Sequence, residues 1–371
     1  MILNTKTFYA VGQGGFYSER IWCNGQERTI VYDCGAVKHS PKDPATQSLI
    51  DSINISGLEK VDFIVVSHLD NDHINGLMSL INYLQSISPV LGKQYEEPIL
   101  ILPNPTLEDL FLFFNGPNSS EECIEVFSDV LSSVKRILLI SNDEKEEKFV
   151  DLDTAGIDVK TESHNSDFCI FDKKDGWLLK FYVDKAKYVK MIGNAKIIKQ
   201  IENVSIKDFI DQDEQKRRKK IKDIKDLFKS VKIGKSDKSR MNNSSMAMIS
   251  APCNADVRAR NCERGRNSPY ISWLNGDICL KEEDELSRIE NHYHVFLSLN
   301  IDFQVPHHGS HNNLGQVPHF NRCARTYIWA GEENSYGHPN GTILRMLKRA
   351  GLEINWITEE DDHIIRHEEW I

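Results

Sequence analysis

The densest chemistry in the sequence lies between residues 67 and 73, which read Ser-His-Leu-Asp-Asn-Asp-His. Four potential metal ligands fall within six residues, namely His68, Asp70, Asp72 and His73. Imidazoles and carboxylates can hold two divalent ions side by side, which would polarise phosphoryl oxygens and generate a hydroxide at neutral pH. The alternative is a solvated polar turn. Because the segment follows an apolar run and precedes a helical pattern, its position favours a metal site.

A second group of potential ligands lies far downstream. Asp277 follows a glycine at the end of an apolar run, and His338 precedes a proline. Taken singly, Gly-Asp and His-Pro are typical of plain turns. His307 and His308 are adjacent, and two neighbouring imidazoles rarely serve packing alone. The order of these residues after His68–His73 favours one shared site.

The elements that must position these residues can be predicted from the apolar pattern. Residues 62–67 contain the continuous apolar run Phe63-Ile-Val-Val, which is typical of a strand buried on both faces. Leucines and isoleucines then recur at helical spacing, so a strand–loop–helix unit is expected over about residues 62–85. The candidate ligands would lie in its loop, at the carboxyl end of the strand.

Further elements are expected along the whole chain. Strand patterns occur at 3–11, 29–32, 99–102, 136–140, 177–183, 245–250, 271–274, 302–305, 327–330 and 353–358, the last of which is expected to close the chain. Helical patterns occur at 119–133, where Ser119 and Glu122 resemble a capping box, and at 342–350. Strands grouped at both ends with helices outside predict an α/β protein of two packed sheets flanked by helices, forming a single domain over 1–371.

Residues 185–240 differ in composition and are expected to form a Lys-rich, largely helical insertion. Residues 216–240 hold 12 basic and three acidic side chains, whereas the whole chain has 45 basic and 55 acidic ones and a net charge of −10. An acidic body repels polyanions, so any nucleic acid must bind a local basic surface. The candidates are Lys216, Arg217, Arg218, Lys219 and Lys220. The alternative is a solvated helix whose lysines only aid solubility.

In this insertion an apolar stripe of Ile221, Ile224, Phe228 and Val231 is expected to dock on the body or on a second subunit. The lysines expected on the exposed face are Lys222, Lys225, Lys229, Lys232 and Lys235.

Composition excludes several classes of protein. With 40% apolar and 27% charged residues, the chain is expected to fold as a soluble globular protein. No apolar run approaches the roughly 18 residues of a membrane span, and the first residues lack the pattern of a signal peptide. The eight cysteines are scattered without a C-x-x-C pair. We therefore expect a reduced, cytoplasmic protein without membrane contact.

The order H-x-D-x-D-H, G-D-I, H-H-G-S and Y-G-H-P resembles the metallo-β-lactamase superfamily, in particular the soluble hydrolase domain of ComEC-type competence proteins. Residues 11–14, 31–35 and 242–245 resemble further landmarks of that domain. The resemblance covers roughly residues 1–85 and 240–360. It implies an αββα sandwich, a two-metal site at one edge of the sheets, and hydrolysis, often of phosphodiesters.

The resemblance also implies roles for single residues. His68 and Asp70 would serve one metal, Asp72 and His73 the other, and Asp277 would bridge them. His338 matches a late ligand position. His307 and His308 match the position that supplies a ligand or a proton donor, and which residue does which is open. Asn243 and Ser245 fall where many relatives place another metal-binding histidine, so the first metal would have fewer ligands.

This chain departs from the family at three points. Asp70 replaces a histidine that most of the superfamily has, which shifts metal preference toward Mn²⁺ or Mg²⁺ relative to the Zn²⁺ of His-rich sites. Relatives tend to have an aspartate where this chain has Gly15. The membrane channel of the competence proteins is absent, so DNA uptake is not expected.

Three functions are compatible with these patterns. The first is a binuclear phosphodiesterase, above all a DNA or RNA nuclease, in which Asp72, His307 and His308 take part in catalysis with two Mn²⁺, Zn²⁺ or Mg²⁺ ions. The second is a hydrolase of a small substrate such as a cyclic nucleotide, lactone or thioester. The third is a non-catalytic binding protein. A second copy of the chain, or a protein partner from a bacterial defence locus, is a further expectation.

Overall fold

The computed structural model describes most of the chain, and its described residues are 2–37, 44–105, 121–142, 149–151, 159–171, 176–183, 191–192, 195–201, 204, 214–229, 232–233, 245–253, 271–319, 325–332, 334–360 and 364–370. Within these ranges no helix is both long and apolar enough to cross a membrane.

Two mixed sheets dominate the described part of the chain. The first has the strand order β18 (Ile365–Trp370), β1 (Ile2–Phe8), β2 (Gly14–Cys23), β3 (Gln26–Ala36), β4 (Phe63–Val65), β5 (Ile99–Pro103), β6 (Arg136–Ser141) and β8 (Val159–Ser163). Its strands are antiparallel from β18 to β3 and parallel from β3 to β8.

The second sheet has the order β17 (Glu353–Ile357), β16 (Arg325–Trp329), β15 (Ile301–Gln304), β14 (Ile271–Leu274), β13 (Met246–Pro252), β10 (Trp177–Val183), β9 (Asp167–Cys169) and β7 (Phe149–Asp151). The strands from β14 to β17 are parallel, so their carboxyl ends share one edge. That edge carries most of the downstream candidate ligands.

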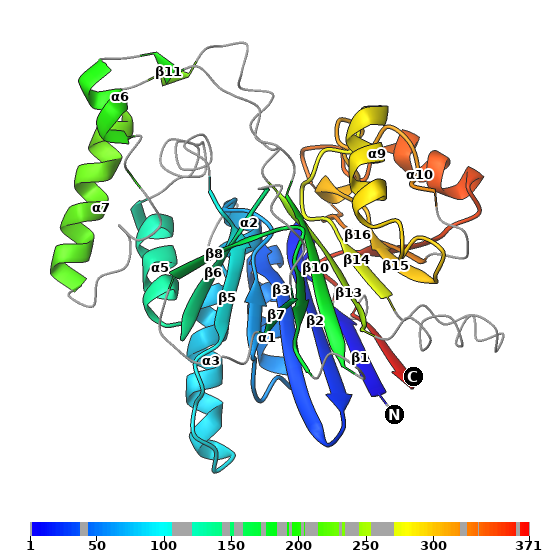
Figure 1. Ribbon diagram of the computed structural model, residues 1–371, viewed down its shortest axis with the longest axis horizontal. Helices are drawn as coiled ribbons and strands as arrows, with labels where there is room; N and C mark the ends of the chain where they lie inside the picture. Colours follow the sequence, from blue (N-terminus) through cyan, green and yellow to red (C-terminus); the bar gives the residue numbers. More distant parts are fainter. Residues whose placement is uncertain are drawn as a thin grey trace.

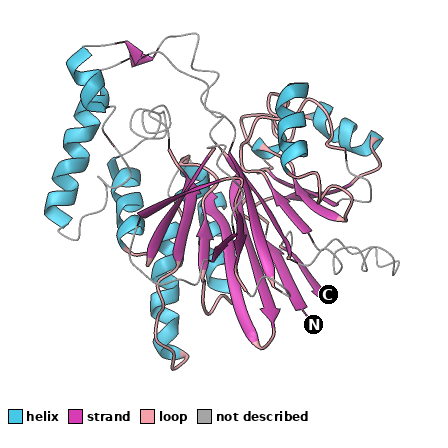
Figure 2. Ribbon diagram, viewed as in Figure 1, coloured by secondary structure: helices cyan, strands magenta, loops and turns pink. Residues whose placement is uncertain are grey.

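Helices cover the outer faces of the two sheets (Figure 1). Helices α1 (Pro44–Ile55), α3 (Leu77–Val90) and α5 (Glu121–Ser132) lie along the first sheet, and α9 (Glu283–His292) and α10 (Gly341–Arg349) lie beside the second. Figure 2 shows the strands gathered between these two sets of helices. This αββα arrangement confirms the predicted fold class.

The apolar residues divide into two clusters that match these layers. One joins the facing surfaces of the sheets with the inner faces of α3 and α5, and includes β4, whose Phe63, Ile64 and Val65 are all buried. The other lies between the second sheet and its helices, where Leu286 and Ile289 of α9 pack near β14 and β15. The predicted strand at 62–67 is thus a central strand, buried on both faces.

The Lys-rich insertion contributes β11 (Met191–Ile192), α6 (Ala195–Ile201), α7 (Glu214–Lys229) and β12 (Lys232–Ile233). Helix α7 packs against α5 and α6, and its Ile221, Ile224 and Phe228 are buried, so the apolar stripe docks on the body as predicted. The prediction for Lys225 is wrong: its side chain is buried, because it lies one helical turn after Ile221 on the same stripe. Val231 and Lys235 lie outside the described residues.

Other differences arise where strands are polar. The strand at 353–358 does not close the chain, because β18 follows it and pairs antiparallel with β1. The first 35 residues are expected to form short strands, but no bounds were predicted for β2, since Ser18, Glu19 and Arg20 interrupt its apolar residues. Helix α9, rich in acidic residues, was not predicted either. The capping residue Ser119 lies outside the described residues.

Candidate metal centre

The candidate ligands come together at the carboxyl ends of strands from both sheets. The loop after β4 carries His68 and leads into the short helix α2 (Asn71–Ile74), which carries His73. Asp277 follows β14, and the 3-10 turn η3 (His307–Gly309) follows β15. Because β14 and β15 are parallel neighbours, their following loops leave the sheet at the same edge. The first sheet therefore contributes His68 and His73 to the cluster, and the second sheet contributes Asp277, His307 and His308.

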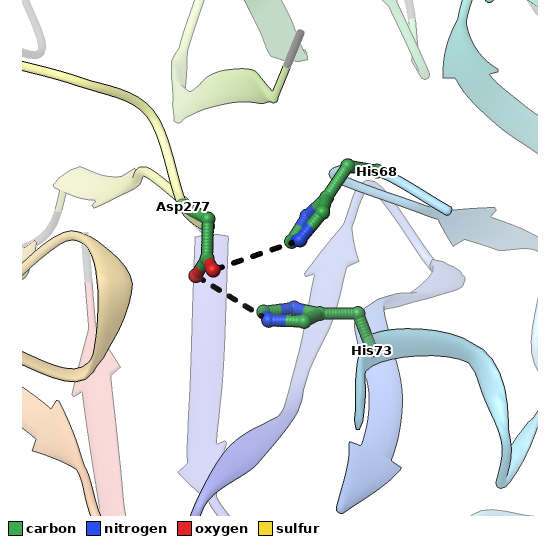
Figure 3. Close-up of side chains that lie close together, drawn as sticks. All are labelled: His68, His73 and Asp277. Atoms are coloured by element: carbon green, nitrogen blue, oxygen red, sulfur yellow. Dashed lines mark ion pairs between the residues drawn. The ribbon is translucent and has the colours of Figure 1, made fainter. Parts of the chain in front are cut away.

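Asp277 is the centre of this cluster. Its Oδ2 lies 3.7 Å from His68 Nε2, and its Oδ1 lies 3.4 Å from His73 Nε2. Figure 3 shows both imidazoles, carried by different segments, directed at the one carboxylate. His307 Nδ1 lies 3.1 Å from Asp277 Oδ2. His308 Nε2 lies 3.9 Å from Asp277 Oδ1, so four imidazoles surround one buried carboxylate.

A second trio adjoins the first. His308 Nε2 lies 3.3 Å from Asp72 Oδ2, which is 4.0 Å from His73 Nε2. The ligand atoms of His68, His73 and Asp277 lie within 4.8 Å of one another, and so do those of Asp72, His73 and His308. Ligands bonded at about 2.1 Å to one tetrahedral ion lie about 3.4 Å apart, so both trios have suitable dimensions.

The hydrogen-bonding state of these atoms tests whether the cluster fits metal ions. Buried polar atoms in proteins are almost always hydrogen-bonded. Here a set of buried atoms lacks any hydrogen-bond partner, and it comprises His68 Nε2, His73 Nε2, Asp277 Oδ1, His307 Nδ1, His308 Nε2 and His338 Nδ1. Unpartnered imidazole nitrogens and a carboxylate oxygen are ligand atoms for divalent metals. The residues therefore fit a metal centre.

Asp33, within β3, orients both imidazoles of the first trio. Its Oδ2 lies 2.8 Å from His73 Nδ1, and its two oxygens accept hydrogen bonds from Ser67 N and Ser67 Oγ at 2.7 and 2.8 Å. His68 Nδ1 lies 2.9 Å from Ser67 Oγ and can donate to it. With both Nδ1 atoms engaged, both Nε2 atoms turn toward Asp277, the arrangement that metal-binding histidines usually have.

Neither Asp33 nor Ser67 was predicted as a functional residue. Asp33 was seen only as part of a family landmark. The available signal was its charge: it is a carboxylate immediately after the apolar run Ile30–Tyr32 of a buried strand, where an unpaired charge is unfavourable.

Glycines allow α2 to approach β3 closely. A Cβ on Gly35 would lie 2.5 Å from the backbone carbon of Asp72. A Cβ on Gly15 would lie 3.3 Å from Asp33 Cβ and 3.4 Å from His73 Nδ1. Gly15, where relatives tend to have an aspartate, therefore adjoins the Asp33–His73 pair. In this chain the carboxylate beside His73 Nδ1 comes from Asp33 instead.

Ser245 holds the backbone of the Asp277 loop. Its Oγ accepts a hydrogen bond from Asp277 N at 2.9 Å and donates one to Asn275 O at 3.3 Å. Gly276 has a φ of +52°, and a Cβ there would lie 2.5 Å from Ser67 Cβ, so a glycine is required at this close approach. Asn243, the other residue expected near a missing histidine, lies outside the described residues.

The electrostatics of the cluster favour a bound cation. Burial opposes a charge on His73, but the carboxylates of Asp33, Asp277 and Asp72 outweigh it and hold the pKa of His73 well above its usual range. Burial likewise opposes ionisation of Asp277, but the surrounding histidines hold its pKa well below the usual range. The carboxylates around His73 therefore favour a positive charge at this position. In the absence of a metal ion, protonation of His73 provides that charge.

Two predicted ligands lie at the rim. Asp70 Oδ2 is 3.6 Å from His68 Nε2, but the Asp70 side chain is 46% exposed and belongs to neither trio. The His338 ring lies 5.9 Å from that of His307 and 6.4 Å from that of His308. Burial lowers the pKa of His338 to about 4, so this imidazole is neutral at pH 7.

The basic candidates lie elsewhere. Lys216, Arg217, Arg218, Lys219 and Lys220 belong to α7, which Figure 1 shows beyond α5, on the opposite side of the molecule from α9 and α10. The side chains of Lys216, Arg218, Lys219 and Lys220 are exposed.

No protein-family model matches the chain, and no curated protein matches its sequence. The metallo-β-lactamase fold protein YhfI from Bacillus subtilis is 9% identical with a TM-score of 0.39, covering 99% of this chain and 100% of that one. Zn²⁺-bound PqqB from Methylobacterium extorquens is 8% identical with a TM-score of 0.38 and the same coverage. A long-form RNase Z from yeast is 16% identical over 38% of this chain and 19% of that one, with a TM-score of 0.20.

Proposed function

We propose that this protein is a metal-dependent hydrolase that cleaves phosphodiester bonds, and that its substrate is DNA or RNA. The observation that carries the proposal is the convergence of buried, unpartnered ligand atoms on Asp277 and Asp72. Divalent ions held there would supply the Lewis acid that activates water and neutralises charge on phosphoryl oxygens. No nucleophilic side chain is then required.

His73 limits how the ions can be shared. Its Nδ1 is paired with Asp33, so only Nε2 can bind a metal, and one nitrogen serves one ion. We assign His73 to the ion held with Asp72 and His308, and His68 to the second ion, with Asp277 between them. Asp70 would complete the second site from the rim.

The paired histidines differ in their surroundings, which suggests how their roles divide. His308 is buried, and its Nδ1 lies 3.0 Å from the carbonyl oxygen of Trp329, to which it can donate, leaving Nε2 free beside Asp72. This is the arrangement of a metal ligand. The His307 side chain is 21% exposed and its Nδ1 faces Asp277, so it can meet substrate and cluster together. We assign proton donation to the leaving oxygen to His307.

The ligand set also bears on the metal. Asp72 at the first site, Asp70 at the second and Asp277 between them would give both ions carboxylate oxygen ligands. Such ligands favour Mn²⁺ or Mg²⁺, whereas a site made only of histidines favours Zn²⁺. Full activity with Zn²⁺ and none with Mn²⁺ would contradict this assignment.

The polynucleotide substrate is supported by the charge distribution. Most of the chain is acidic, whereas α7 exposes a run of basic side chains. A basic surface of this kind binds phosphates without regard to sequence. We propose that α7 guides a polynucleotide past the acidic body toward the metals.

The test is cleavage of plasmid DNA, single-stranded DNA and RNA by purified protein with Mn²⁺, Mg²⁺ or Zn²⁺. We expect cleavage with Mn²⁺ or Mg²⁺, and none by an Asp72→Ala variant that retains the fold. A chromogenic phosphodiester tests the bond type without the polynucleotide. Failure of the wild-type protein on every phosphodiester with every metal would overturn the proposal.

A further inference from the structure

Tyr336 is an exposed aromatic residue beside the metal cluster. Its side chain is 56% exposed, and its ring is within 13° of parallel to that of His338, with the ring centroids 6.1 Å apart. The His338 ring in turn lies 5.9 Å from the His307 ring. A succession of rings thus leads from the cluster to the solvent.

The segment that carries Tyr336 is held in place by hydrogen bonds. Asn334 Oδ1 accepts from His338 N at 2.9 Å, and Asn334 Nδ2 donates to Gly331 O at 2.6 Å. Asn340 N donates to Gly309 O at 3.0 Å, which joins this segment to η3. The backbone on both sides of Tyr336 is therefore fixed relative to the cluster. A binding group on such a support loses little conformational freedom when a ligand arrives.

This side of the cluster is also where solvent reaches the candidate ligands. His307 and Asp70 are partly exposed, whereas His68, His73 and His308 are buried. A phosphate approaching the ions must come from the exposed side. Tyr336 lies on the side of His307, because the His338 ring neighbours both the Tyr336 ring and the His307 ring.

We propose that Tyr336 is a substrate-positioning residue whose ring stacks on a nucleobase while the attached phosphate meets the metal cluster. The inference rests on the proposed phosphodiesterase function and adds a contact with the base to the contacts that the cluster would make with the phosphate. Stacking on a tyrosine ring suits every base, since each has a π face, so it adds affinity without adding sequence preference. A nucleotide places a planar base and a charged phosphate on one sugar, which matches an exposed ring beside a cationic centre.

The test compares two ligands that differ only in the base. Calorimetry would measure the binding of thymidine 5′-monophosphate and of 2-deoxyribose 5-phosphate to the Mn²⁺-loaded protein. We expect Tyr336→Leu to weaken binding of the nucleotide by about five- to 150-fold, the usual effect of removing one stacking ring, and to leave the affinity for the sugar phosphate unchanged. Tyr336→Phe should bind both ligands as the wild-type protein does. Trp22→Leu, which alters an exposed aromatic at the far end of β2, is the matched control.

Several results would overturn the inference. These are equal affinity of Tyr336→Leu for the nucleotide, an equal loss for both ligands, a loss in Tyr336→Phe as large as in Tyr336→Leu, or no nucleotide binding by the wild-type protein. Hydrolysis of thymidine 5′-(p-nitrophenyl phosphate) separates this inference from the proposed function. Base-dependent binding without hydrolysis would support the stacking role of Tyr336 and contradict the proposed hydrolase function. Hydrolysis by the wild-type protein with unchanged nucleotide affinity in Tyr336→Leu would support the hydrolase function and contradict the stacking role.

Discussion

Asp302 in β15 and Asp277, just after the neighbouring strand β14, are both buried carboxylates, but their surroundings differ. Asp302 accepts hydrogen bonds from Lys6 Nζ at 3.0 Å and from Arg325 Nε at 2.7 Å, and Tyr327 Oη donates to it at 3.2 Å. Asp277 has no such cation from Lys or Arg among the described residues; its Oδ1 is buried without a hydrogen-bond partner and faces imidazole nitrogens that are also unpartnered.

The difference separates a structural charge cluster from one that attracts an external cation. The charge of Asp302 is compensated by side chains of the protein itself, so nothing further is needed to bury it. The charge of Asp277 is compensated only if a proton or a metal ion joins the site. We therefore expect changes at Asp277 to remove function and changes at Asp302 to remove stability.

The largest effect is expected from Asp277→Ala. This change should abolish both metal retention and hydrolysis, because it removes the carboxylate that belongs to the first trio and adjoins His308 of the second. The circular dichroism spectrum should stay that of the folded protein. Elemental analysis is the measurement. Two ions per chain in this variant would refute the assignment.

The paired histidines should separate metal binding from proton transfer. We expect His307→Asn to lower kcat by about 10²–10⁴-fold, the usual range for general acid catalysis, with the metal content intact. His308→Asn should lose metal instead, since its Nε2 adjoins Asp72. Measurements of kcat and of metal content on the same preparations distinguish the two roles. Near-normal activity in both variants would show that the two histidines have only a structural role.

At the other carboxylate, Asp302→Ala should lower the free energy of unfolding by about 3–5 kcal/mol, because the buried Lys6 and the largely buried Arg325 would each lose the ion pair with Asp302. Urea denaturation measures this, and the folded variant should still bind Mn²⁺ with normal affinity. Asp284→Ala, which breaks an exposed ion pair with Arg288, is the control and should leave the midpoint unchanged. A loss of metal affinity in Asp302→Ala would contradict our hypothesis that Asp302 serves stability alone and that only the Asp277 cluster serves metal binding.

A smaller effect is expected from Asp33→Asn. The amide can still fill the space but no longer offers a charged acceptor to His73 Nδ1, so the imidazole is less firmly oriented. Metal affinity should fall by about 10–100-fold, as is usual when the partner of a metal-binding histidine is changed. Calorimetric titration with Mn²⁺ measures it, and an unchanged dissociation constant would show that Asp33 serves only the fold.

The smallest effect concerns charge that is exposed rather than buried. Changing Lys216–Lys220 to serine should weaken polynucleotide cleavage and flatten its dependence on salt by about 0.7–0.9 in log–log slope for each phosphate that the variant no longer binds. A small chromogenic phosphodiester should be cleaved as before, since it needs no extended surface. If both substrates and the salt slope are unaffected, α7 is only a solvated helix.

The sequence indicated which candidate ligands lie close together better than it indicated the interactions that support them. His68, His73 and Asp277 were recognisable because each follows an apolar run that had to be a strand, and carboxyl ends of strands meet at one edge. Ser67 and Asp33 are 34 residues apart, and Lys6 and Asp302 are 296 apart, so no local pattern connects either pair. Whether a buried carboxylate meets a lysine or an imidazole depends on the packing of two sheets.

The most direct test of the central claim is an anomalous diffraction map of crystals grown with Mn²⁺, recorded at the manganese edge. We expect two peaks about 3.5–4 Å apart, one bound by Asp72, His73 and His308 and the other by His68, with Asp277 between them. No peak in this cluster, with the imidazoles hydrogen-bonded directly to Asp72 and Asp277, would contradict it.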